Sequence, residues 1–280
     1  MVTGMRKQVR RGAAALTAAA VLVAGTPGDA AASTAVVWDN GVTTGSPDLD
    51  APRPSLSLAK LYLGYWVLYH GAPGDKARVE EMIRFSNDAI ASALDVRYPQ
   101  AIDEIARDFN LTATKRHGRW GSTSTSAHDV ARFIQEIRND PVAAPIMAGM
   151  RTAAPVAADG YLQNYGTSLL PGAQGTKFGW SDDRYTATGT VSFGNGWSAA
   201  ALTYGGAGAN TAEALRDIDV TNRPGPVAPP PQAPAEGPTI LLGPWRLPAI
   251  SVRDLLSPYL PEEFVRLIPV DWLLPVGLPR

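Results

Sequence analysis

The feature that most constrains this 280-residue chain is the order of two hydrophobic periodicities. Apolar residues recur at helical spacing in several segments between residues 55 and 137, as in "AHDVARFIQEI". Between residues 174 and 204 the pattern changes to short β-rich runs, "QGTKFGWSD", "RYTATGTVSF" and "WSAAALTY". Helices that precede a block of strands indicate an α+β fold, with a helical region followed by an antiparallel sheet.

The individual elements follow from this pattern. The segment 55–70 is apolar nearly all round, so it is expected to form a buried helix. The two strands that flank Gly194-Asn195-Gly196 should form an antiparallel hairpin. The segment 112–126, "TATKRHGRWGSTSTS", is expected to be a loop. The other expected elements are a strand at 35–38, helices at 75–86, 89–94, 99–109 and 127–137, helical turns at 144–150, and a closing helix at 211–219.

The first 32 residues resemble a secretory signal peptide. A positive head is formed by Arg6, Lys7, Arg10 and Arg11. A run of small apolar residues follows at 13–25, and Ala30-Ala31-Ala32 offers a cleavage site before Ser33. A membrane anchor fits less well, because a span needs about 20 apolar residues. No cysteine follows the run, which excludes a lipid anchor at that place. We therefore expect an exported protein, secreted or located in the cell envelope.

The end of the chain has a different composition from the main domain, which is expected at residues 33–222. Residues 223–238 form a proline-rich linker, "RPGPVAPPPQAPAEGP". Residues 239–280 form an apolar tail that proline interrupts repeatedly. Exposed apolar patches usually mark interfaces. The tail is therefore expected to cover the main domain, or to dock on an envelope partner or a membrane surface.

Composition excludes several kinds of chemistry. The chain has no cysteine, so disulfides, thiol catalysis and cysteine-ligated metals are excluded. The formal net charge is −1, and nothing in the sequence indicates a nucleic-acid partner. Its three histidines lie far apart and lack the spacing of metal ligands. No metal and no cofactor are expected.

A hydroxyl and an amine lie together in the apolar segment 53–70. Ser57 and Lys60 are one helical turn apart and share a face of the expected helix. The amide dipoles at a helix start favour negative charge on the serine oxygen. Burial lowers the pKa of a lysine, which can then act as a base. The structural alternative is a lysine that extends from the core edge to solvent.

Two further motifs follow in an order that resembles a known family. After Ser57-Leu58-Ala59-Lys60 come Ser86-Asn87-Asp88 at a helix end and Lys177-Phe178-Gly179 on a strand. This order resembles the serine β-lactamases and penicillin-binding proteins, including DD-carboxypeptidases. The resemblance covers roughly residues 53–219 and implies a compact member with a β-lactamase/transpeptidase-like fold.

The resemblance also implies roles for individual residues. Ser57 would be the acylated nucleophile, Lys60 its base, and Ser86 the hydroxyl that passes a proton to the leaving group. Lys177 would shape the electrostatics and hold the substrate carboxylate. Backbone N–H groups of Ser57 and Trp180 would hold the oxyanion. The residues implied on the substrate side are Asp88, Phe178, Gly179 and Trp180.

Several residues depart from the family pattern. Asp88 replaces an asparagine, and an ionised carboxylate only accepts hydrogen bonds; it could pair with Lys60 or Lys177. Phe178 replaces a threonine and removes a hydroxyl. The interval between the first two motifs is short, and the stretch between Leu111 and Ser126 contains no Glu or Asp to serve as the deacylating glutamate of class A β-lactamases.

These departures favour a particular activity. The expectation is a secreted serine hydrolase that acts on peptidoglycan stem peptides or β-lactams through an acyl-Ser57 intermediate. A DD-carboxypeptidase-like enzyme or a slow β-lactamase fits better than a fast β-lactamase. The alternative is a weak or inactive protein of the same fold that binds cell-wall material or an envelope partner. The sequence alone does not decide between them.

Overall fold

The computed structural model describes residues 20–22, 32–225, 239–242, 245–269 and 272–275. They belong to two compact units, Met1–Pro226 and Val227–Arg280. Most of the expected signal peptide and most of the proline-rich linker lie outside the described residues. Within the described ranges, no helix is long and apolar enough to cross a membrane.

The first unit contains helices followed by most of its sheet, as the sequence predicts. Its helical elements are η1 (Leu56–Leu58), α1 (Ala59–His70), α2 (Pro73–Lys76), α3 (Val79–Arg84), α4 (Asp88–Arg97), α5 (Ala101–Asp108), α6 (Ala127–Ile137), η2 (Pro141–Ala143), α7 (Ala144–Arg151), η3 (Gly166–Leu169) and α8 (Ala207–Asp217). Its strands are β1 (Ala20–Leu22), β2 (Ser33–Trp38), β3 (Thr43–Gly45), β4 (Arg53–Pro54), β5 (Lys115–His117), β6 (Arg119–Thr125), β7 (Gly175–Trp180), β8 (Thr188–Gly194) and β9 (Trp197–Thr203).

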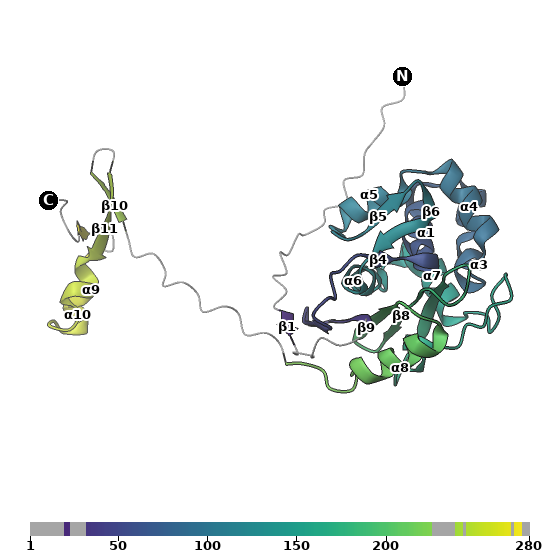
Figure 1. Cartoon of the computed structure of the whole chain (residues 1–280). Coiled ribbons are helices and arrows are strands. Elements are labelled where there is room, and N and C mark those ends of the chain that lie inside the picture. Colours follow the sequence, from purple (N-terminus) through teal and green to yellow (C-terminus); the bar gives the residue numbers. More distant parts are fainter. Residues whose placement is uncertain (1–19, 23–31, 226–238, 243–244, 270–271, 276–280) are drawn as a thin grey trace, which may run out of the picture. The chain divides into compact units, whose positions relative to one another are not determined.

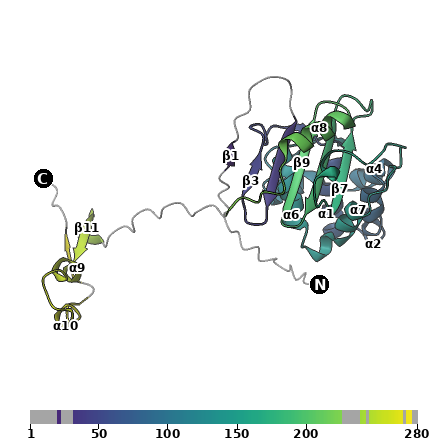
Figure 2. The same ribbon diagram turned by 90° about the horizontal axis from the view of Figure 1, so that it is seen from below.

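The main sheet has the strand order β1-β3-β2-β9-β8-β7, and Figure 2 shows its strands side by side. All neighbouring strands from β3 to β7 are antiparallel, whereas β1 pairs with β3 in parallel. The expected hairpin is present as β8 and β9, and Gly196 in its turn has φ 81°, which glycine adopts without strain. The α+β prediction, with a helical region followed by an antiparallel sheet, is confirmed.

The sheet lies between two layers of helix, with α8 on one face and α6 and α1 on the other (Figure 1). Alternate residues of β9 supply the two cores, because successive side chains on a strand point to opposite faces. Ala200 and Leu202 belong to the larger core on the α1 side. Ala199 and Ala201 belong to the smaller core, which α8 covers with Ala214. This arrangement leaves β7 as an edge strand of the sheet.

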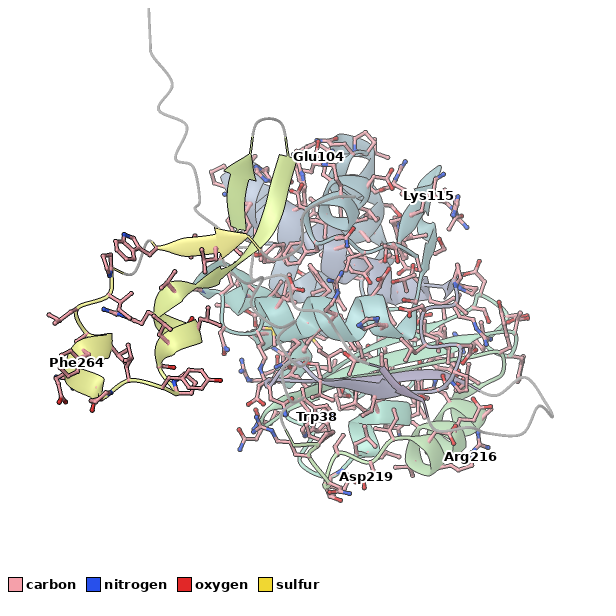
Figure 3. The ribbon with its side chains drawn as sticks, turned by 90° about the vertical axis from the view of Figure 1, so that its left-hand side faces the viewer. Trp38, Glu104, Lys115, Arg216, Asp219 and Phe264 are labelled. Atoms are coloured by element: carbon pink, nitrogen blue, oxygen red, sulfur yellow. The ribbon has the colours of Figure 1, made fainter. Side chains whose placement is uncertain are left out.

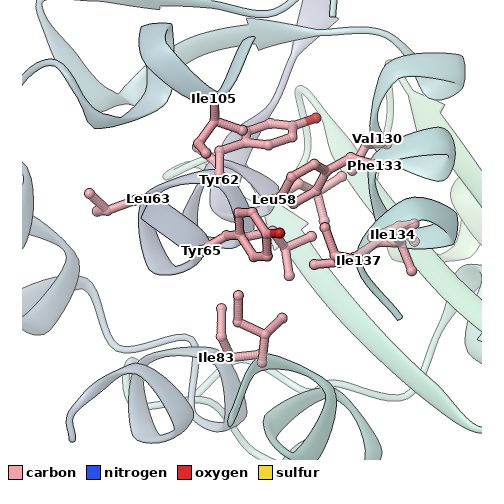
Figure 4. Packing of buried hydrophobic residues seen from close by; sticks show 14 of the residues in the cluster. Leu58, Tyr62, Leu63, Tyr65, Ile83, Ile105, Val130, Phe133, Ile134 and Ile137 are labelled. Atoms are coloured by element: carbon pink, nitrogen blue, oxygen red, sulfur yellow. The ribbon is translucent and has the colours of Figure 1, made fainter. Parts of the chain in front are cut away.

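Helix α1 is the centre of the larger core, as its apolar sequence predicts. Its side chains from Ala59 to Leu68 are buried on all sides. Tyr62 packs against Phe133 of α6 with ring centroids 4.9 Å apart, and Tyr65 makes an edge contact with the same ring at 5.5 Å. Figure 4 shows these side chains converging with Ile83 and Ile105. The surrounding helices therefore fix the start of α1 in place.

The prediction of a loop at 112–126 is wrong. This segment contains β5 and β6, which form a small antiparallel sheet with β4. The inward residues of β6 are threonines, so its alternation is not visible as a hydrophobic pattern. Thr123 and Thr125 are buried, and Thr125 Oγ1 lies 2.8 Å from the Tyr62 hydroxyl and 2.8 Å from Thr114 Oγ1. Hydrogen bonds between buried hydroxyls satisfy Thr125, whereas the buried hydroxyl of Thr123 has no hydrogen-bond partner among the described residues.

Other elements also differ from the sequence expectation. The single helix expected at 75–86 is divided into α2 and α3. Strand β3, which is only three residues long, was not among the expected elements. Helix α8 begins at Ala207 rather than near residue 211. Its early start includes Asn210, whose buried side chain donates to Ala201 O at 3.0 Å. The side chain of Asn210 thus binds the first turn of α8 to the sheet. Hydrophobic periodicity did not indicate a helix at this turn.

The second unit is a small module. Its elements are β10 (Thr239–Leu242), β11 (Trp245–Ser251), α9 (Val252–Leu256), α10 (Glu262–Val265) and β12 (Leu273–Pro275), and its sheet has the order β10-β11-β12. Among its side chains with a described burial, only Ala249 is buried. Tyr259, Phe264 (labelled in Figure 3), Leu267 and Trp272 are exposed. Those of its side chains with a described burial therefore contribute little to a core.

Candidate active site

The first part of the site is the junction of η1 and α1. Ser57 lies in η1 and Lys60 in the first turn of α1, so both point to one side. Lys60 Nζ lies 2.6 Å from Ser57 Oγ. Leu56, directly before the serine, has φ 53°, a conformation that a leucine rarely adopts. Strained backbone of this kind clusters at functional sites.

The second part is the junction of α3 and α4. Asn87 is the N-cap of α4, and its side chain accepts a hydrogen bond from Ile90 N at 3.1 Å. The cap places Ser86 and Asp88 on either side of it, and Ser86 also has a positive φ of 50°. Asp88 Oδ1 lies 2.6 Å from Lys60 Nζ, so the predicted pairing of Asp88 with a lysine is present.

The third part is the edge strand β7. Lys177 Nζ donates to Ser86 Oγ at 2.8 Å and to the carbonyl oxygen of Phe178 at 2.9 Å. Three separate elements therefore bring together two serine–lysine pairs, Ser57 with Lys60 and Ser86 with Lys177. All four residues predicted to be catalytic meet in one place.

The β7 residues predicted on the substrate side have different surroundings from one another. Gly179 packs directly on η1: a Cβ at this position would lie 3.0 Å from Ser57 N and 2.9 Å from Leu56 Cβ. Only glycine allows this approach, which brings the β7 backbone beside the nucleophile. The Phe178 side chain is buried against Tyr165, with centroids 5.2 Å apart, on the opposite face of the strand from Lys177.

Trp180 is half-buried at the end of β7. Its ring stacks on Tyr161 with centroids 4.6 Å apart, and its Nε1 donates to Asp159 Oδ2 at 2.9 Å. The aromatic pair and the carboxylate form one wall next to the β7 edge. Asp159 and Tyr161 were not predicted as site residues, because the turn-forming stretch "AADGY" carries no chemical motif.

Burial controls the electrostatics of the two lysines. Burial lowers the pKa of Lys60 to about 8, although the charge and hydrogen bond of Asp88 oppose the shift. Burial also holds the pKa of Lys177 well below its ordinary value, and the nearby Lys60 adds to this effect. Asp88 and Asp159 act in the other direction on both lysines. Lys60 can therefore lose its proton near neutral pH.

The site is almost closed to solvent. Ser57 is 7% exposed, and Lys60 and Lys177 are 0% exposed, whereas the Asp88 side chain is 64% exposed. Solvent therefore meets the site at Asp88. Two surface cavities of about 410 and 530 Å³ are lined by other residues, at β4–β6 and around the end of α8. Within the described part of the chain, no cluster of three or more histidine or acidic residues could hold a metal ion.

Comparison with known proteins adds information on the fold. The chain matches no protein-family model and no curated protein. It is similar to the solved structure of the β-lactamase from Streptomyces albus G, with a TM-score of 0.53 at 14% identity, over 65% of this chain and 91% of the other. A class A β-lactamase from Mycobacterium abscessus gives 0.51 at 12% identity, over 65% and 92%.

A penicillin-binding protein is similar as well. Penicillin-binding protein D2 from Listeria monocytogenes, in a cefotaxime-bound form, gives a TM-score of 0.50 at 16% identity, over 69% of this chain and 97% of the other. The chain thus has the fold of the serine β-lactamases and penicillin-binding proteins, as its three motifs predict. Within this fold, the serine–lysine pairs lie on η1–α1, the α3–α4 junction and β7.

Proposed function

We propose that this protein is an exported serine acyl enzyme that acts on peptidoglycan stem peptides or β-lactams through an acyl-Ser57 intermediate. The observation that carries the proposal is the position of Lys60 Nζ, 2.6 Å from both Ser57 Oγ and Asp88 Oδ1, in a buried site. A nucleophile in contact with a base that a third group orients is the arrangement of covalent catalysis.

Acylation uses these contacts in order. Neutral Lys60 takes the proton of Ser57 Oγ, which attacks the carbonyl carbon of the substrate amide and forms the C–O bond. The backbone N–H groups of Ser57 and Trp180 are proposed to hold the developing oxyanion. The C–N bond then breaks. The leaving nitrogen takes the proton of the Ser86 hydroxyl, which touches Lys177, and the proton that Lys60 took from Ser57 replaces it. Hydrolysis of the ester by water returns Ser57 to its hydroxyl form.

A fluorescent penicillin tests the proposal. Wild-type protein should become covalently labelled, and Ser57→Ala should not. Ser55→Ala is the matched control, because Ser55 is also buried and lies two residues earlier. Folding of each variant is checked by thermal melting. Equal labelling of wild type and Ser57→Ala, or no labelling of a folded wild type, would refute the acyl enzyme.

The closed site supports a second candidate function. Ser57 is nearly buried, Lys60 and Lys177 are fully buried, and the Phe178 side chain is buried against Tyr165. These features favour a weak or inactive protein of the same fold that binds cell-wall material or an envelope partner. Such a protein would sediment with purified peptidoglycan in both wild type and Ser57→Ala, and neither would be labelled.

Export is the third element of the proposal. The first residue of β2 is Ser33, directly after the expected cleavage site, and β2 lies inside the sheet between β3 and β9. The main domain thus retains this central strand after removal of residues 1–32. N-terminal sequencing of the protein from its native host should begin at Ser33. A mature protein that begins at Met1 would contradict the proposed signal peptide.

A further inference from the structure

Trp120 of β6 lies directly on the proposed base. The centroid of its indole ring is 3.9 Å from Lys60 Nζ, so the face of the ring covers the amine. Trp120 belongs to the segment 112–126, in which no acidic residue was found to act in deacylation. An aromatic side chain from this segment thus lies beside the lysine.

The ring is fixed from helix α4. Its Nε1 donates to Ser92 Oγ at 3.1 Å, and its backbone N donates to Asp95 Oδ2 at 3.1 Å. Asp95 itself accepts hydrogen bonds from Nε and Nη2 of Arg116, at 2.7 and 2.9 Å. Helix α4 therefore carries both Asp88, on the solvent side of the amine, and the two residues that hold Trp120.

The hydrogen-bond donors of the Lys60 ammonium are all engaged. A lysine ammonium has three donors. One points to Ser57 Oγ, the second to Asp88 Oδ1, and the ring face covers the third. The other charged groups that act on this amine are Lys177 from β7 and Asp159 from the segment before η3. In its ammonium form, Lys60 thus has no donor left for a water molecule within the described part of the chain.

We propose that Trp120 is a positioning residue that seals Lys60 from bulk water and thereby prolongs the life of an acyl-Ser57 intermediate. Deacylation needs a water whose oxygen attacks the ester carbon while a base takes its proton and the Ser57 C–O bond breaks. The indole occupies the space beside the only described amine that touches Ser57 Oγ. The second part of this inference rests on the proposed acyl enzyme; the sealing of Lys60 does not.

Chemical modification tests the seal without any substrate. Near neutral pH, acetic anhydride should leave Lys60 unmodified in wild type, as read by mass spectrometry of its peptide. The exposed Lys115 (labelled in Figure 3) is the internal reference. In Trp120→Ala, acetylation of Lys60 should rise at least about tenfold relative to Lys115. Trp120→Phe keeps a ring over the amine and should remain largely protected. Trp272→Ala removes an exposed indole of the second unit and should change nothing at Lys60.

Release of bound penicillin tests the consequence. Trp120→Ala should lose its label at least about tenfold faster than wild type, a modest part of the ~100-fold or more that a proton-transfer group contributes. If Trp120→Ala does not fold, Ser92→Ala removes the bond that orients the ring and should act in the same direction. Unchanged Lys60 acetylation and unchanged release in these folded variants would overturn the proposal. A wild type that is never labelled would refute the acyl enzyme, while Lys60 acetylation would still decide whether Trp120 is a seal.

Discussion

Asp88, whose side chain is largely exposed, lies 2.6 Å from the ammonium of Lys60, which is fully buried. The carboxylate is thus the solvent-side partner of a charge that otherwise contacts a hydroxyl and an indole ring. Burial disfavours the ammonium form, and Asp88 favours it. This balance places the pKa of Lys60 at about 8, so the carboxylate controls how much free base is present near neutral pH.

Asp88→Asn should therefore preserve the fold and move the acidic limb of the acylation profile to lower pH. The amide still accepts a hydrogen bond from Lys60, but the negative charge that raises the pKa of the amine is gone. At neutral pH, acylation should be equal to wild type or faster. The rate of labelling by fluorescent penicillin across a pH series measures this effect. Complete loss of labelling in a folded Asp88→Asn protein would show that the carboxylate itself is required.

Lys60 should also contribute a pH dependence to stability. Its ordinary pKa is 10.5, and in the folded protein it is about 8. Between these values the unfolded chain binds more protons at this site, so the free energy of unfolding rises with pH. Below about pH 8 the shift destabilises the folded protein by roughly 3 kcal/mol, from 1.36 kcal/mol per pKa unit. This penalty is lost above pH 10.5, where both states are neutral.

Other buried groups also make stability depend on pH. Lys177 acts in the same direction as Lys60, whereas buried tyrosines such as Tyr62, whose pKa is raised, act against it. The Lys60 contribution is therefore measured by comparing two variants. Urea unfolding of Lys60→Met should show a smaller rise between about pH 8 and 10.5 than wild type, because only the Lys177 contribution remains. Lys115→Met, which changes an exposed lysine, should keep the rise seen in wild type. Identical slopes in the two variants would mean that the Lys60 pKa is not shifted by folding.

Much of the arrangement follows from local sequence signals. The apolar repeat of α1, the Gly-Asn-Gly turn between β8 and β9, and the order of the three motifs place Ser57, Lys60 and Lys177 on the correct elements. The interval between the first two motifs is short, and Asn87, as the N-cap of α4, fixes the position of the neighbouring Ser86.

Other parts depend on tertiary contacts that no local pattern contains. Strand β6 turns threonines inward, and the Thr125 hydroxyl pairs with those of Tyr62 and Thr114. The position of Trp120 follows from Ser92 and Asp95, which lie on another element. The Phe178 side chain, expected on the substrate side, packs on Tyr165, because strand alternation turns it away from the face on which Lys177 lies.

Gly179→Ala should separate β7 from the nucleophile. The added methyl group would meet Leu56 Cβ at 2.9 Å and Ser57 N at 3.0 Å, so the strand must move. We expect a loss of about 1–3 kcal/mol in the free energy of unfolding, typical of overpacking, and a larger loss of acylation. Urea unfolding and penicillin labelling measure the two effects.

Gly208→Ala is the matched control, because a methyl group there meets no atom within 4 Å and lies in helix α8. This control should gain up to about 1 kcal/mol. Wild-type acylation in Gly179→Ala would show that the close approach of β7 is not required for the reaction.

The C-terminal module gives a prediction about truncation. Its exposed side chains, among them Phe264, Leu267 and Trp272, form an apolar surface when the module is taken by itself. A chain that ends at Gly225 keeps every strand of the main sheet. If the module covers the main domain, the truncated protein should melt several degrees lower or aggregate. If it docks on the envelope, melting should be unchanged and association with envelope fractions should be lost. A truncated protein unchanged in both respects would contradict both roles.

The central claim is that Ser57 is a nucleophile activated by Lys60, and mapping a covalent adduct tests it most directly. Folded protein is treated with penicillin, digested, and analysed by fragment-ion mass spectrometry. We predict the mass of one ring-opened penicillin on Ser57, not on Ser55, and its absence from folded Lys60→Met. An unmodified Ser57 at saturating penicillin, or an adduct that forms equally without the Lys60 amine, would contradict the claim.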